Sequence, residues 1–113
     1  KIQRVCRDAI RRGLEAFRPG KRVKDVTLTM QKYIAETGFV PRPPFGHVCG
    51  IDLVEERVTL DNERLIVPGF AAIVHPMVQT ADGKNLIFWG ETYLAAEEGC
   101  ERLHRTGDDL LTL

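Results

Sequence analysis

The sequence predicts an α+β domain in which two helices precede a mainly antiparallel sheet. From residue 1 to about residue 37, apolar residues recur every three or four positions, which is the period of an amphipathic helix. After the proline-rich segment 40–45, short runs rich in β-branched and aromatic residues alternate with turn residues, which is typical of strands. Helices followed by a run of strands indicate the α+β class.

The first predicted helix starts at Ile2 and ends before Pro19-Gly20, because proline and glycine do not continue a helix. The second runs from about Val23 to Thr37, with Gly38 as its C-terminal stop. We expect both apolar stripes to pack in the core.

Three later segments are expected to form strands, namely His47–Val54, Phe70–Gln79 and Asn85–Ala96. The sequence ADGKN between the last two is typical of a hairpin turn. A hairpin joins antiparallel strands, so the sheet should be mainly antiparallel.

Charge and hydropathy exclude some function classes. The chain has 113 residues, of which sixteen are basic and sixteen acidic. The one basic cluster, Arg4, Arg7, Arg11 and Arg12, has helical spacing and acidic neighbours, so it predicts a solvated helix face and no nucleic-acid partner. There is no apolar run near 18 residues, so we expect no membrane partner.

The cysteines and the start of the chain give two further expectations. Cys6, Cys49 and Cys100 lack the spacing of a metal or redox site, which predicts reduced thiols and a cytoplasmic location. The helical pattern is already under way at Ile2 without a capping residue, so we expect the chain to be part of a longer protein.

The segment GHVCGID contains a candidate functional histidine. His47 follows a proline-rich stretch and lies between Gly46 and Gly50, where the backbone can approach a ligand closely because glycine has no side chain. Such a histidine is either a working residue or a hydrogen-bonded loop residue. The motif alone leaves both interpretations open.

The segments RPGKRVKDV, ETGF, GHVCGID, LIVPGFAAIVHP and GETYLAAEEGCERL resemble, in this order, the C-terminal half of the pita-bread hydrolases. This group includes methionine aminopeptidase, Xaa-Pro aminopeptidase, prolidase and creatinase. The resemblance implies that residues 1–113 form the second half of a pita-bread domain, with two helices packed on a curved, mainly antiparallel sheet. The N-terminal half of the same chain is then its partner.

The resemblance also implies a site. The peptidases of the family hold two divalent metals with two aspartates from the N-terminal half, one histidine and two glutamates. His47 matches the histidine ligand. Val54 stands where the peptidases carry a further histidine, and a valine cannot handle a proton. His75 stands at the first glutamate position, and an imidazole cannot bridge two ions as a carboxylate does.

The second glutamate position falls on Gly90, next to Glu91. Adjacent residues of a strand point to opposite faces, so Glu91 would reach the site only through a bulge at Gly90. The resemblance therefore implies His47 and His75 as catalytic residues. If a manganese, cobalt or zinc ion binds, it implies His47, His75 and Glu91 as ligands, and the lost positions leave open that no metal binds.

For the intact protein, the resemblance implies a hydrolase of amide-type C–N bonds, similar to an Xaa-Pro aminopeptidase or dipeptidase with an atypical metal site. A peptide or small amide is the expected substrate and a homodimer the expected assembly, while this fragment alone should be inactive. One alternative is a metal-independent enzyme similar to creatinase or ectoine hydrolase, in which the two histidines bind the substrate or handle its proton. Another is a non-catalytic binding or dimerisation module.

Overall fold

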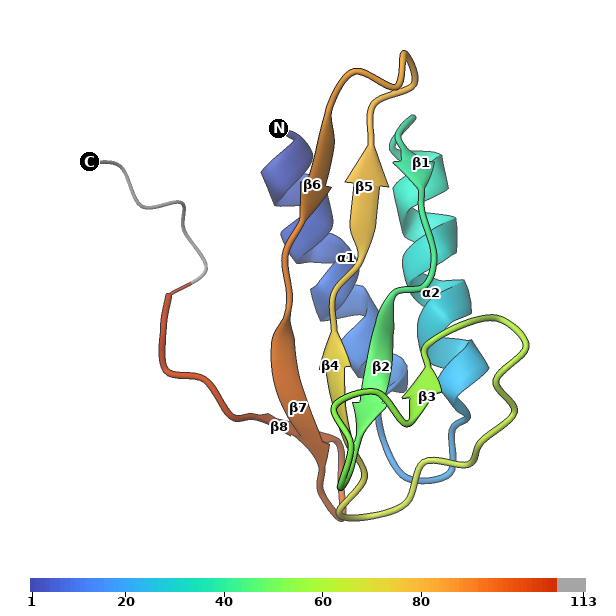
Figure 1. The fold of residues 1–113 in the computed structure, drawn as a ribbon, viewed down its shortest axis with the longest axis vertical. Helices are drawn as coiled ribbons and strands as arrows, with labels where there is room; N and C mark the ends of the chain where they lie inside the picture. The colour runs from blue at the N-terminus through green and yellow to red at the C-terminus, as the bar shows by residue number, and fades with distance from the viewer. Residues whose placement is uncertain (108–113) are drawn as a thin grey trace.

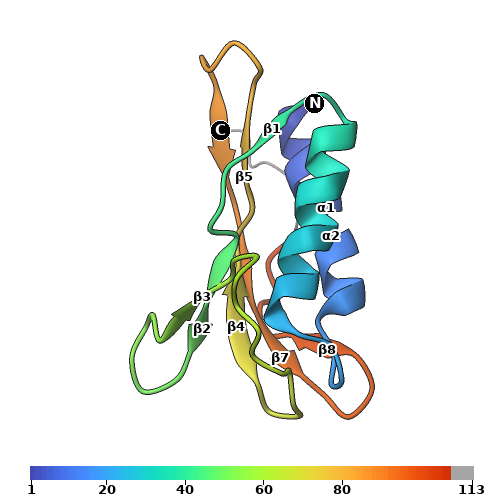
Figure 2. The ribbon, with the colours of Figure 1, turned by 90° about the vertical axis from the view of Figure 1, so that its right-hand side faces the viewer.

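The structure is a computed structural model that describes residues 1–107. Two helices, α1 (Ile2–Ala16) and α2 (Val23–Glu36), lie side by side and cover one face of the strands, so the molecule has two layers (Figures 1 and 2). Within the described residues, no helix has the length and hydropathy that a membrane span requires. The order of helices and then strands confirms the predicted α+β class.

Both helices begin and end near the local signals in the sequence. α1 stops three residues before Pro19. At the start of α2, the Asp25 carboxylate accepts a 2.7 Å hydrogen bond from the backbone N–H of Arg22, which satisfies one of the free donors of the first turn. After its end, Gly38 adopts a φ of 84°, a left-handed conformation that glycine takes without steric strain.

The strands form two antiparallel sheets that follow one another along the long axis of the molecule (Figure 1). Within residues 1–107 the strands are β1 (Val40–Pro41), β2 (Gly46–Cys49), β3 (Glu56–Arg57), β4 (Ala71–Val74), β5 (Met77–Gln79), β6 (Leu86–Phe88), β7 (Glu91–Ala95) and β8 (Cys100–Arg102). One sheet has the order β1-β5-β6 and the other the order β3-β2-β4-β7-β8. Every pair of neighbouring strands is antiparallel, as the hairpin signal predicted.

Two of the three predicted strands are divided at the level where the sheets meet. Phe70–Gln79 forms β4 and β5, which are separated by His75-Pro76, and Asn85–Ala96 forms β6 and β7, which are separated by Trp89-Gly90. Pro76 has no backbone N–H to donate to a sheet ladder. The N–H of His75 donates to the carbonyl oxygen of Phe45 at 2.8 Å, so the link between β1 and β2 lies at the same level.

The third predicted strand, His47–Val54, is shorter than expected. Only its first part forms β2, and residues 50–55 form a loop before β3. The backbone N–H of Gly50 donates to the carbonyl oxygen of Asp52 at 3.2 Å, so the chain turns back on itself instead of extending the ladder. The prediction of a continuous strand was wrong because this turn ends it.

The core lies between the helices and the sheets. Its largest fully buried side chains include Phe17, Phe45, Ile10, Met30, Ile34 and Ile66. Cys6 is also buried there, and burial raises the pKa of its thiol to about 11, so it packs as a small apolar group. Along β2 and β4, Val48 and Val74 point into this core, on what we call the helix-covered face. Alternation places their neighbours His47 and Ile73 on the opposite side, the open face.

Candidate functional site on the open face

His47 lies on β2 and its ring has a defined orientation. Nδ1 of the imidazole is 2.8 Å from the backbone carbonyl oxygen of Leu53. Because a carbonyl oxygen can only accept, Nδ1 carries the hydrogen when the ring is neutral, and the lone pair is left on Nε2. His47 can therefore use Nε2 to accept a proton or to bind a cation.

His75 follows β4 and lies beside His47. The two ring centroids are 5.3 Å apart, and the His75 ring also lies 4.7 Å from the ring of Phe88. The two imidazoles that the resemblance implies as catalytic residues are therefore close enough to contact one small molecule. Nδ1 of His75 is buried and, among the described residues, has no hydrogen-bond partner outside its own residue. Such buried atoms without a partner are uncommon.

The surroundings of His75 favour its neutral form. Burial lowers the pKa of His75 below the ordinary value of an imidazole, and the nearby His47 ring acts in the same direction, while a contact with its own backbone opposes both. His75 is thus neutral at neutral pH. A neutral imidazole offers one N–H donor and one lone pair, so His75 can bind either end of a polar group.

Gly90 lies against His75 and has no room for a side chain. A β-carbon added at Gly90 would lie 2.4 Å from the β-carbon of His75 and 2.3 Å from the carbonyl oxygen of Val74. Both distances are far shorter than a van der Waals contact. In this backbone arrangement, the position that matches the family's second glutamate has room only for glycine.

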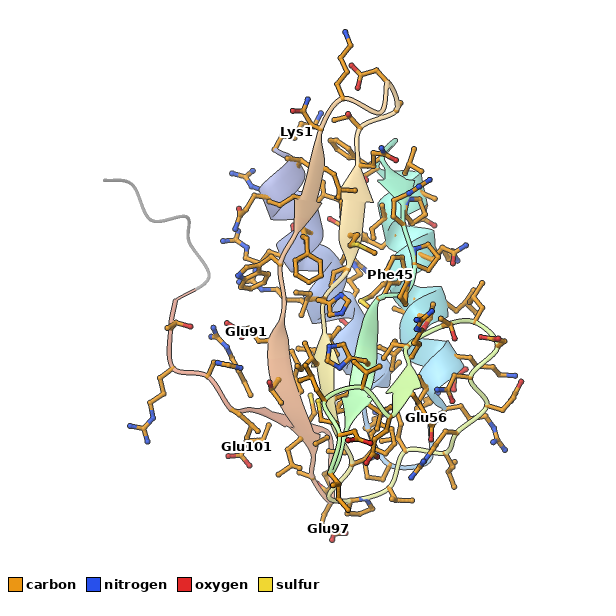
Figure 3. All side chains as sticks on the ribbon, in the orientation of Figure 1. Lys1, Phe45, Glu56, Glu91, Glu97 and Glu101 are labelled. Atoms are coloured by element: carbon orange, nitrogen blue, oxygen red, sulfur yellow. The ribbon has the colours of Figure 1, made fainter. Side chains whose placement is uncertain are left out.

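Glu91 does not lie with the two histidines. It stands opposite Val74 in the regular register of β4 and β7, without a bulge, so it points to the helix-covered face. The side chain is 6% exposed, and both of its oxygens accept hydrogen bonds from Arg102. The hydroxyl of Tyr93 lies 3.5 Å from one of these oxygens. Figure 3 shows Glu91 among the other side chains. The prediction of Glu91 as a third ligand beside His47 and His75 is corrected by this register.

The residues of this chain do not fit the pair of divalent metals that the resemblance implies. Across residues 1–107, no three histidine, cysteine, aspartate or glutamate side chains lie together in a way that could hold an ion. Val54, at the place of a peptidase histidine, is an exposed hydrocarbon side chain. Within this part of the chain, the potential ligands that lie together are the imidazoles of His47 and His75.

Three contributors to this geometry escaped the sequence analysis. The Leu53 carbonyl that orients His47 is a backbone atom, which no residue pattern identifies. Arg102 meets Glu91 only through the β7–β8 register, in which it lies opposite Tyr93. Phe88 lies against the His75 ring with 59% of its surface exposed, a contact between segments that no local residue pattern identifies.

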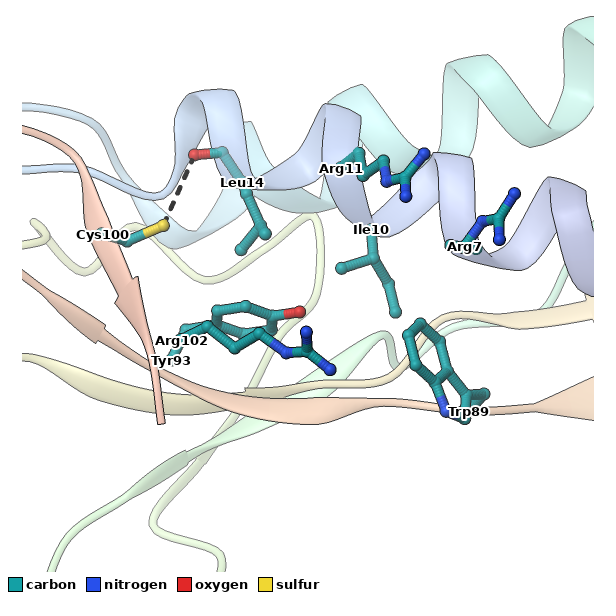
Figure 4. Close-up of a pocket in the computed structure, with 8 residues that line it drawn as sticks. All are labelled: Arg7, Ile10, Arg11, Leu14, Trp89, Tyr93, Cys100 and Arg102. Carbon is teal, nitrogen blue, oxygen red and sulfur yellow. Dashed lines mark hydrogen bonds between the residues drawn. The ribbon is translucent and has the colours of Figure 1, made fainter. Parts of the chain in front are cut away.

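A separate cavity of about 210 Å³ lies on the other side of the sheet, between α1 and the β7–β8 pair (Figure 4). It is lined by Arg7, Ile10, Arg11, Leu14, Trp89, Tyr93, Cys100 and Arg102. Since neither His47 nor His75 lines it, this cavity is distinct from the candidate site.

Two helices on one face of an antiparallel sheet are the arrangement expected for one half of a domain of the pita-bread class. The sequence profile of Metallopeptidase family M24 matches residues 1–97, and the chain belongs to this family. The methionine aminopeptidase of Salmonella typhimurium is 26% identical over 133 residues, which cover 98% of this chain and 50% of that relative. The chain therefore spans about half the length of this curated relative.

Solved structures confirm the fold. The Xaa-Pro dipeptidase from Bacillus anthracis has a TM-score of 0.88 at 21% identity, and the match covers 99% of this chain and 32% of that one. The prolidase from Pyrococcus horikoshii has a TM-score of 0.87 at 23% identity, covering 97% of this chain and 32% of that one. The expected likeness to the pita-bread fold is thus confirmed over nearly the whole chain.

Proposed function

We propose that the protein hydrolyses an amide-type C–N bond, with His47 as general base and His75 as a substrate-binding neighbour. The observation that carries this proposal is the pair of imidazoles on the open face, with ring centroids 5.3 Å apart. Membership of a metallopeptidase family supports hydrolysis of a peptide bond. Relatives named prolidase and Xaa-Pro dipeptidase make dipeptides that end in proline the first substrates to test.

The tautomer of His47 suits it to activate water. The Leu53 carbonyl holds the hydrogen on Nδ1, so the lone pair on Nε2 can take a proton from a water molecule as the water oxygen attacks the substrate carbonyl carbon. The resulting imidazolium then gives this proton to the leaving nitrogen as the C–N bond breaks. The carboxylic acid and the amine are released, and His47 returns to its neutral form.

His75 supports the same step through its neutral state. Because burial and the neighbouring ring lower the pKa of His75, it remains neutral while His47 gains a positive charge. Its N–H can donate a hydrogen bond to the substrate carbonyl oxygen, where negative charge develops. Phe88, whose ring is 4.7 Å away, provides an apolar wall beside it.

In this proposal, a part of the protein other than residues 1–113 completes the site. Residues 1–113 are the second half of the catalytic domain, and the other half supplies the opposite wall of the substrate site. That half covers the open face, where Leu86 and Phe88 are more than half exposed. A cytoplasmic homodimer remains the expectation for the whole protein.

The family match favours a second candidate, an Xaa-Pro peptidase that depends on a divalent metal. In it, His47 would hold the ion through the lone pair on Nε2, carboxylates from the other half of the domain would complete the set, and the ion would supply Lewis-acid activation of water. The two candidates differ in their response to a chelator. Activity persists in EDTA if the histidines act on the substrate directly and is lost if they hold a metal.

The test is a kinetic comparison in the full-length protein, using a panel of Xaa-Pro dipeptides and small amides. His47→Ala should lower kcat/KM about a hundredfold or more, the scale of losing a positioned acid–base group. His104→Ala is the matched control, because His104 is exposed and contacts Thr92 at 3.2 Å on β7, which is two strands away from His47 on β2. Equal rates in both variants would contradict the role of His47, whereas no hydrolysis of any of these substrates by the unaltered protein would favour the binding module.

A further inference from the structure

The loop of residues 50–55 supplies the carbonyl group that orients His47, although its own side chains are not packed. All six residues of this loop are exposed. Leu53, whose backbone oxygen accepts from Nδ1 of His47, has 71% of its surface exposed. Side-chain burial therefore does not hold the carbonyl oxygen of Leu53 in place. The hydrogen bonds of the loop must do so.

Glu55 makes the side-chain hydrogen bond that closes this loop. Its Oε1 atom accepts from the backbone N–H of Ile51 at 2.9 Å, across the base of the loop. Its own backbone N–H donates to the carbonyl oxygen of Val48 on β2 at 3.1 Å, which fixes the residue against the strand. The carboxylate thus joins the two ends of the loop, and Leu53 lies between them.

Gly50 leaves room for the carboxylate of Glu55 because it has no side chain. A β-carbon at Gly50 would lie 2.1 Å from Oε1 of Glu55, so the carboxylate occupies the space beside the bare α-carbon. The glycine that makes the segment after His47 look like a ligand-approach motif therefore has a second use, which is to let Glu55 reach the backbone of Ile51.

We propose that Glu55 is a positioning residue for His47. By holding Ile51, its carboxylate keeps the Leu53 carbonyl at Nδ1 of His47 and so keeps the hydrogen on Nδ1 and the lone pair on Nε2. This inference deepens the proposed function. It rests on that function only in assigning Nε2 of His47 as the atom that accepts a proton from water.

The test is nitrogen-15 NMR of the imidazole rings in the protein, at a pH well above the ordinary imidazole pKa of about 6.5. The unaltered protein should show a protonated Nδ1 and an unprotonated Nε2 for His47. In Glu55→Ala the two signals should move toward each other as the tautomers exchange. In Glu55→Gln the amide oxygen accepts the same hydrogen bond, so the signals should return to their original positions.

Asp52→Ala is the matched control, because it removes an equal charge from the same loop and leaves the backbone turn at Asp52 in place. Its His47 signals should stay unchanged, and the ring signals of His104 should not move in any variant. Unchanged His47 signals in Glu55→Ala would overturn the inference, as would a shift in Glu55→Ala that Glu55→Gln does not reverse. Because this readout is not activity, it can fail while His47→Ala still abolishes hydrolysis, and it can succeed where hydrolysis is absent.

Discussion

Titratable groups on the two faces of the sheet have opposite hydrogen-bonding environments. On the helix-covered face, the carboxylate of Glu91 is buried and both of its oxygens accept hydrogen bonds from Arg102. On the open face, the lone pair of His47 is left on Nε2, and Nδ1 of His75 has no partner outside its residue among the described part of the chain. A fully paired carboxylate stabilises the fold, whereas an oriented imidazole with a lone pair can do chemistry. This contrast supports the proposal that the open face is the functional face.

The difference depends on one position in the sequence. Gly90 and Glu91 are adjacent residues near the break between β6 and β7, and adjacent residues of a strand face opposite sides. The carboxylate that the resemblance places near a metal lies one residue further along, so it points into the core. A similar motif can thus preserve a residue type while changing the face on which it acts.

The largest expected effect on stability is at Glu91. Glu91→Ala leaves the guanidinium of Arg102 without its buried partner, so the free energy of unfolding should fall by about 2 to 3 kcal/mol, as for hydrogen bonds between charged groups. We expect a smaller loss of unfolding free energy than for a fully buried ion pair, because the Arg102 side chain is 34% exposed. Urea unfolding measures it.

Glu101→Ala is the matched control for this variant, since Glu101 is an exposed glutamate on the neighbouring strand β8. It should change the free energy of unfolding by no more than about 0.5 kcal/mol. If both variants are equally stable, Glu91 is not a structural residue and the contrast between the faces is lost.

A smaller loss is expected at Gly90. In Gly90→Ala the new β-carbon meets the carbonyl oxygen of Val74 and the β-carbon of His75, which should lower the free energy of unfolding by about 1 to 3 kcal/mol. Combining it with His75→Gly removes one of the three close contacts, the one to the β-carbon of His75. The double variant should therefore be more stable than the sum of the two single effects predicts, and strict additivity would show that the residues do not compete for space.

The sequence predicted the helices well because their signals are local. Apolar periodicity, Pro19-Gly20 and Gly38 act within a few residues of the elements that they delimit. The division of the long strands at His75-Pro76 and Trp89-Gly90 could not be predicted in the same way. It depends on contacts between segments distant in the sequence, such as the 2.8 Å hydrogen bond from His75 to Phe45.

The site was predictable only in part. The resemblance to a family brought His47 and His75 together, and the structure agrees, with ring centroids 5.3 Å apart. It could not decide the direction of Glu91, because a bulge at Gly90 and a regular strand are both compatible with the same residues. It also could not identify Arg102 as the partner of Glu91, since that pairing depends on the β7–β8 register.

The smallest expected effect is on pH dependence. Because the pKa of His75 is lowered in the folded state, the unfolded state takes up the proton first as the pH falls. The stabilisation due to neutral His75 is thus present above the unfolded pKa of about 6.5 and is lost as the pH falls from there toward the folded pKa. Urea unfolding over this range should show a flatter pH dependence in His75→Gln, and an unchanged slope would mean that His75 is not held neutral.

Calorimetric titration of this chain with manganese and with zinc tests most directly the claim that the open face presents two histidines in place of a metal pair. Only two imidazoles lie together among the described residues, and Glu91 is held on the other face, so binding should be weak, with a dissociation constant well above about 1 μM. Glu91→Ala should leave this weak binding almost unchanged, because Glu91 lies on the helix-covered face. Binding tighter than about 1 μM that His47→Ala abolishes would contradict the account and show that the chain forms a metal site of its own.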